Sequence, residues 1–96
     1  MTLDDVKLYL RIDTDEEDTE LQQLINASIG YIESTTGKKY NDSYPLMGQL
    51  SLLLISHWYT NRNMANKSSM IAEYPHSITD MLTTIKYNAT YEEVTP

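Results

Sequence analysis

Residues 3–37 read LDDVKLYLRIDTDEEDTELQQLINASIGYIESTTG. In the first part of this stretch, Leu3, Val6 and Leu10 recur at the spacing of one face of a short helix. An acidic run follows, at a place where the positive end of a helix dipole favours carboxylates by about 0.3–1 kcal/mol each. The last part is long and amphipathic, and it closes at Gly37, which suits a left-handed helix end. The stretch therefore predicts a short helix followed by a longer one.

Two further helices are expected in the second half of the chain. Pro45 suits the first turn of a helix, because its fixed φ fits there and its missing N–H would have had no partner. The helix that follows is apolar on two sides, which is typical of a central helix. A last helix is indicated by apolar residues at helical spacing from Ile78 to Ile85. The residues expected to form the core are Leu24, Ile25, Leu50, Leu53, Leu54, His57 and Trp58.

These patterns predict an all-α protein, built as a small bundle of four helices. A chain of 96 residues is the size of one domain with a single small core. The expected ordered core covers about residues 2–87. The expected helices lie at about 2–11, 15–36, 45–62 and 77–87, with a long loop at 63–76 and a polar C-terminal tail at 88–96.

The formal net charge of −7 is concentrated at one end of the chain. Residues 1–37 hold nine acids against Lys7 and Arg11, whereas residues 38–96 hold five acids and five bases. Tight binding to DNA depends on lysines and arginines that displace counterions from phosphates. A chain without a basic patch is therefore expected to bind DNA weakly.

No motif for catalysis, metal binding or cofactor binding occurs in the sequence. The chain has no cysteine, its histidines are His57 and His76, and its three glycines are scattered rather than gathered in a phosphate-binding loop. We therefore expect no enzyme activity, no catalytic or metal site and no cofactor. No apolar run reaches the roughly 20 residues of a membrane span, so we expect a soluble protein with no membrane contact.

Interaction surfaces are expected outside the main apolar face of the third helix. The second arc of that helix is apolar, the loop is too long for a simple connection, and the tail has no helical pattern. Exposed apolar side chains on a small domain often mark a partner. The candidate contacts with another copy or another protein are Leu52, Ile55, Tyr59, Arg62, Met64, Met70, Ile71, Tyr74, Tyr87 and Tyr91.

Four sequence blocks occur in an order that resembles one known family. They are LDDVKLYLRID at 3–13, the acidic helix start that closes at Thr36 and Gly37, the His57-Trp58-Tyr59-x-Asn61-Arg62 block, and Pro75 before Ile78-x-x-Met81-Leu82. Together, over about residues 2–87, they resemble the head-tail connector, or head-completion, proteins of tailed bacteriophages and prophages. The chain departs from that family after Arg62, where Asn63 and Met64 replace a commonly acidic position.

The resemblance implies a structural virion protein rather than an enzyme. Such a protein forms a ring of its own copies, twelvefold to match the portal, beneath the portal protein at the capsid vertex. It extends the DNA channel, lets double-stranded DNA pass without specific binding, and docks the next stopper, neck or tail protein. It is found at the virion neck, and in the host cytoplasm before assembly.

Two alternatives come from other classes of protein. A small acidic protein can mimic DNA and inhibit a basic host protein through carboxylates such as those at 13–20. Such a mimic would be a monomer or dimer whose affinity collapses in salt, whereas a connector would form or join rings. A helix-turn-helix regulator is also built from short helices, but it needs a basic recognition helix, and neither of the last two helices has more than one Lys or Arg.

Overall fold

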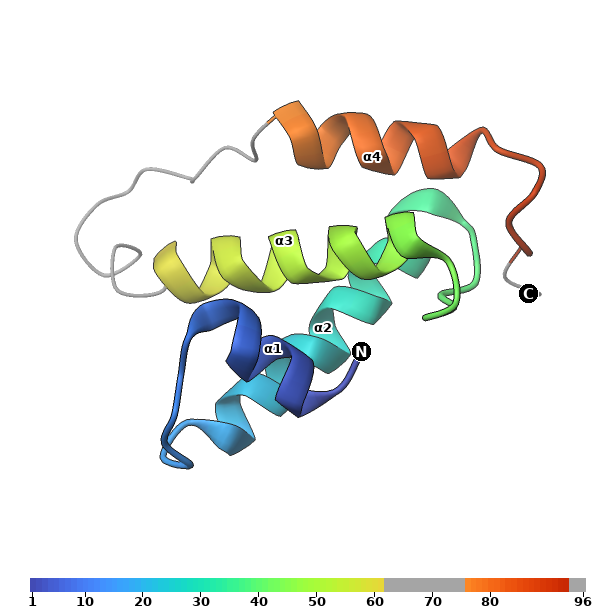
Figure 1. The fold of residues 1–96 in the computed structure, drawn as a ribbon. Helices are drawn as coiled ribbons and strands as arrows, with labels where there is room; N and C mark the ends of the chain where they lie inside the picture. Colours follow the sequence, from blue (N-terminus) through green and yellow to red (C-terminus); the bar gives the residue numbers. More distant parts are fainter. Residues whose placement is uncertain (62–75, 94–96) are drawn as a thin grey trace.

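The computed structural model describes residues 1–61 and 76–93 and contains four α-helices within them (Figure 1). No strand occurs in these two ranges, and a single isolated bridge pairs Lys38 with Glu93. The all-α architecture predicted from the sequence is confirmed. The helices are α1 (Leu3–Leu10), α2 (Asp18–Thr36), α3 (Pro45–Asn61) and α4 (His76–Lys86).

Helix α3 lies across the middle of the molecule, with α4 on one side and α1 on the other (Figure 1). Helices α1 and α4 each pack against α2 and α3, but they do not pack against each other. This arrangement explains why α3 is apolar on two sides. It has a separate partner helix on each side, and α2 contacts both.

Local backbone signals set the ends of the helices. Thr2 and Asp5 form the reciprocal hydrogen bonds of a capping box at the start of α1. Arg11 ends α1 in the left-handed conformation at φ 60°, and its N–H donates to carbonyls of the preceding turn. Gly37 ends α2 in the same conformation at φ 71°, where a residue without Cβ is favoured.

Helix α2 begins later than the sequence predicts. Its first residue is Asp18 rather than Asp15, and the Asp18 N–H donates to the Asp15 carbonyl at 3.3 Å. The residues between them form a turn, and the N-cap Glu17 makes no side-chain capping bond. The prediction failed here because a run of acids favours a helix start without specifying which residue begins it.

The core consists of two apolar clusters on the two sides of α3. The larger cluster joins α3 to α4 and to the C-terminal half of α2. Its buried members are Ile32, Met47, Leu50, Leu54, Ile78, Leu82 and Ile85. The smaller cluster joins α3 to α1 and to the N-terminal half of α2. Its buried members are Val6, Leu21, Ile25 and Ile55.

Two buried serines lie where α2 and α3 meet. The hydroxyl oxygens of Ser28 and Ser51 are 2.7 Å apart, and both residues are fully buried. Ser28 also donates to the carbonyl oxygen of Ile25 at 2.8 Å. Because a hydroxyl has one proton, Ser51 is then the donor to Ser28. The pair satisfies two polar groups inside the core and fastens the two long helices together.

Candidate interaction surfaces

The second arc of α3 is covered by the chain itself. Ile55 has no exposed surface and belongs to the smaller cluster, and Leu52 and Tyr59 are half-buried against that cluster. The expectation that this arc lies outside the core is therefore wrong. Helix α1 and the first half of α2 occupy the space that a partner was expected to fill.

The other residues expected in the core range from fully buried to half-buried. Ile25, Leu50 and Leu54 are fully buried, whereas Leu24, Leu53 and Trp58 are half-buried against the clusters. The Trp58 ring meets Tyr31 edge-on, with 5.8 Å between ring centroids. His57 is half-buried near the end of α3, next to a hollow described below.

Part of the acidic run holds α1 in place. The Lys7 ammonium donates to Asp15 at 2.9 Å and to Asp18 at 2.8 Å, which joins α1 to the start of α2. These hydrogen bonds raise the pKa of Lys7 above its ordinary value. In addition, the Tyr59 hydroxyl donates to the Glu17 carboxylate at 2.6 Å. Three of the run's carboxylates therefore accept hydrogen bonds from within the fold.

The start of the C-terminal tail folds back onto the α2–α3 loop. The Lys39 N–H donates to the Glu92 carbonyl, and the Lys38 ammonium lies 3.4 Å from the Glu93 carboxylate. The Tyr91 ring packs edge-on against Tyr44 with 4.8 Å between centroids. The sequence places the end of the ordered core near residue 87, but residues 91–93 of the tail pack against the rest of the chain. The sequence did not reveal this packing because these contacts join segments about 50 residues apart and leave no local pattern.

The same loop contains Tyr40, a tyrosine whose phenol has a raised pKa. Tyr40 packs against the larger cluster, and its backbone N–H donates to the Glu33 carboxylate at 2.9 Å. Burial, followed by the nearby Asp42 carboxylate, raises the pKa of the Tyr40 phenol well above its ordinary value. Tyr40 therefore stays neutral into the alkaline range and acts as part of the packing of this loop.

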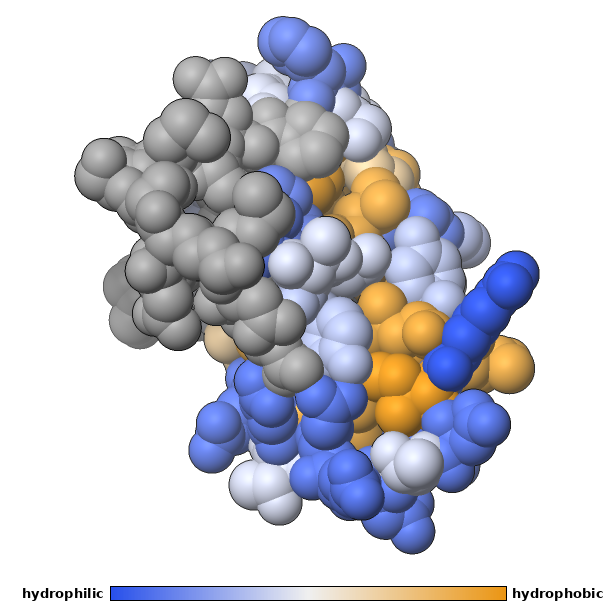
Figure 2. Space-filling view, turned by 90° about the vertical axis from the view of Figure 1, so that its left-hand side faces the viewer, coloured by the Kyte–Doolittle hydropathy of each residue, from blue (hydrophilic) through white to orange (hydrophobic). Residues whose placement is uncertain are grey.

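Large apolar side chains are exposed at two places in the described chain. Leu8 is 81% exposed and Tyr9 is 43% exposed, both on α1, while Tyr87 is 77% exposed just after α4. Figure 2 shows apolar side chains gathered at the level of α1, ringed by hydrophilic ones. Sequence reasoning singled out Tyr87 but missed Leu8 and Tyr9. They lie outside the helix face that carries Leu3, Val6 and Leu10. Apolar residues outside the buried face of a helix are expected to be exposed, so this spacing could have revealed them.

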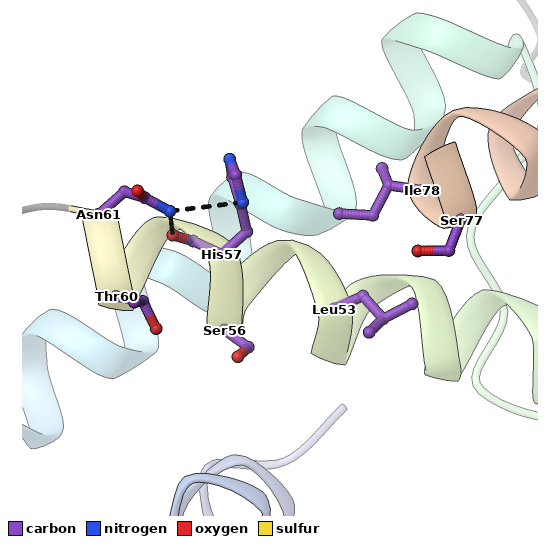
Figure 3. A pocket seen from close by; sticks show the side chains of 7 residues that line it. All are labelled: Leu53, Ser56, His57, Thr60, Asn61, Ser77 and Ile78. Carbon is purple, nitrogen blue, oxygen red and sulfur yellow. Dashed lines mark hydrogen bonds between the residues drawn. The ribbon is translucent and has the colours of Figure 1, made fainter. Parts of the chain in front are cut away.

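A shallow hollow of about 240 Å³ lies between the end of α3 and the start of α4 (Figure 3). Asn61 bridges back to His57, donating to its carbonyl oxygen at 2.7 Å and approaching its Nδ1 atom at 3.4 Å. The lining includes hydroxyls and an imidazole but no carboxylate or lysine among the described residues.

Five of the predicted contact residues lie outside the described residues. They are Arg62, Met64, Met70, Ile71 and Tyr74. Their assignment as subunit or portal contacts stays a prediction.

Neither a metal centre nor a membrane-spanning helix is found in residues 1–61 and 76–93. No group of three or more His, Cys, Asp or Glu side chains is placed to hold a metal ion there. None of the four helices is long and apolar enough to cross a bilayer. What the described surface offers is exposed apolar and charged side chains, which suit contacts with other proteins.

Comparison with known proteins connects this helical fold to one family. The family model described as phage gp6-like head-tail connector protein matches residues 1–86, which include all four helices. Neither the comparison with curated proteins nor the comparison with solved structures found a match. The family match agrees with the resemblance of the four sequence blocks, and it covers most of the chain. The chain belongs to the family of phage gp6-like head-tail connector proteins.

Proposed function

We propose that the protein forms a ring beneath the portal, extends the DNA channel, and docks the next stopper, neck or tail protein. The family makes it a structural protein of the phage neck, at the head-tail interface of the virion. Beyond this role, we propose that the ring is twelvefold and matches the portal, and that the protein resides in the host cytoplasm before assembly. The family match over residues 1–86 is the observation that carries it.

The charges of the described residues support a channel through which DNA slides. The described residues carry thirteen Asp or Glu against five Lys or Arg. Of these cations, Lys7 is bound to Asp15 and Asp18, and Lys38 lies beside Glu93. A cation already paired with a carboxylate gives little affinity for phosphate. We therefore propose that duplex DNA passes without specific binding. At physiological salt, a gel-shift experiment with the isolated protein should show weak binding or none.

The internal contacts of the acidic run weigh against the DNA-mimic alternative. Asp15 and Asp18 accept hydrogen bonds from Lys7, and Glu17 accepts one from Tyr59. A mimic needs its carboxylates to face a partner in the spacing of DNA phosphates. Here, three carboxylates of the run already serve to hold α1, α2 and α3 together.

The experiment that tests the proposal is sedimentation of the protein with and without purified portal rings. We expect the protein to co-sediment with the portal and to add one copy per portal subunit. If it stays at the top of the gradient with portal present, the proposal fails. Salt-sensitive binding to a basic host protein without portal binding would instead favour the mimic.

A further inference from the structure

The two most exposed large apolar side chains of the described residues lie at opposite ends of the molecule. Leu8 is in the last turns of α1, and Tyr87 follows the last residue of α4. These helices pack on different sides of α3, and their C-terminal ends point in opposite directions (Figure 1). We call the two places the α1 end, made by Leu8 and Tyr9, and the α4 end, made by Lys86 and Tyr87.

The α1 end has an acidic surround. Asp4 and Asp5 precede Leu8 and Tyr9 by one helical turn and are exposed. Exposed Asp13 and Glu16 follow in the connection to α2. Of the two cations nearby in the sequence, Lys7 is held by Asp15 and Asp18, and Arg11 is exposed at the end of the helix. Carboxylates therefore dominate the charge around the apolar side chains at this end.

The α4 end combines an exposed aromatic ring with ammonium groups. The Lys86 ammonium lies 5.6 Å from the centroid of the Tyr87 ring. Lys39 is exposed, and its backbone hydrogen bond to Glu92 fixes it beside the segment that follows Tyr87. Exposed carboxylates at this end come from Glu92 and Glu93, and Glu93 is paired with Lys38. An apolar surface that carries Lys86 and Lys39 is a complement for an acidic one.

We propose that the α1 end of one copy docks on the α4 end of the next copy. The inference rests on the proposed function, because it names the contact through which the ring would form. Two different surfaces that meet make a head-to-tail interface, which closes into a ring when its rotation allows. A two-fold contact between α1 ends would instead bring like charges together, which opposes it.

Single cysteines at the two ends test this contact, because the chain has no cysteine of its own. Two variants of different mass, Leu8→Cys and Tyr87→Cys, are mixed at equal concentration and treated with a short bismaleimide crosslinker. Random collision yields as much mixed product as the two homodimers together. The proposed contact should raise the ratio of mixed product to homodimers several-fold above this one-to-one value, and high salt should lower the excess.

A matched control and a separate readout keep the result unambiguous. Gln23→Cys places the thiol at an exposed position of α2 that belongs to neither end, and it should give only the random share with either partner. A random share for the Leu8→Cys and Tyr87→Cys pair overturns the inference. If the wild-type protein still joins portal rings in that case, the proposed function stands and another surface forms the ring. If it does not join them, the proposed function itself fails.

Discussion

The two sides of α3 are held by different means. The larger cluster has seven buried apolar residues and is closed by two helices and the returning tail. The smaller cluster has four, and one of its walls is the eight-residue α1. An isolated helix of that length is unstable in water. The hydrogen bonds from Lys7 and Tyr59 to the acidic run therefore help to hold α1, α2 and α3 together on the side where fewer apolar residues are buried.

The largest expected effects come from two neighbouring residues of α3, one on each side. Leu54→Ala and Ile55→Ala should each lower the free energy of unfolding by about 2–5 kcal/mol, because both leave a cavity in a core. Chemical denaturation measures the loss. Amide hydrogen exchange should distinguish the two variants. Ile55→Ala should speed exchange selectively in α1, whereas Leu54→Ala should speed it in α4. Identical exchange patterns would contradict the division into two clusters.

The next largest loss of stability is expected from Ser28 and Ser51, the buried serines between α2 and α3. Ser28→Ala or Ser51→Ala should each cost about 1–3 kcal/mol, because either change disturbs a buried hydrogen bond. The double variant should cost less than the sum, because the two residues share that bond. Ser34→Ala, on the exposed face of α2, is the control and should change little. Strict additivity of the two substitutions would show that the bond contributes nothing.

Much of the fold could be predicted from local patterns, but the partners of each face could not. Periodicity and caps located four helices, and they also showed that α3 is apolar on two sides. They could not show that α1 covers Ile55, because a helical pattern reveals a face and not what lies against it. The contact of Tyr91 with Tyr44 and the Ser28–Ser51 bond were missed for the same reason.

A smaller effect is expected from the hydroxyl that joins α3 to the acidic run. Tyr59→Phe removes the donor to Glu17 but keeps the ring, so it should lower the free energy of unfolding by about 0.5–1.5 kcal/mol. Thermal melting followed by circular dichroism is the measurement. Tyr87→Phe, at an exposed ring, is the matched control and should melt like the wild type. A Tyr59→Phe variant that melts equally high would mean that the bond adds no stability.

The smallest effect is expected at Lys7 and depends on pH. Lys7→Met should loosen α1, seen as faster amide exchange in that helix with little change in the melting temperature. The raised pKa of Lys7 means that its ammonium stabilises the fold fully below the ordinary value of 10.5. That contribution is lost as the pH rises through the higher value of the folded state. A difference in the protection of α1 between variant and wild type that persists at still higher pH would contradict this.

We propose that this small helical protein assembles on the portal as a ring. Electron microscopy of portal rings incubated with the protein tests it most directly. We expect an added ring of density on one face of the portal, coaxial with the channel and with the portal's own symmetry. Portal particles that show no added density at saturating protein, or density without rotational symmetry, would contradict it.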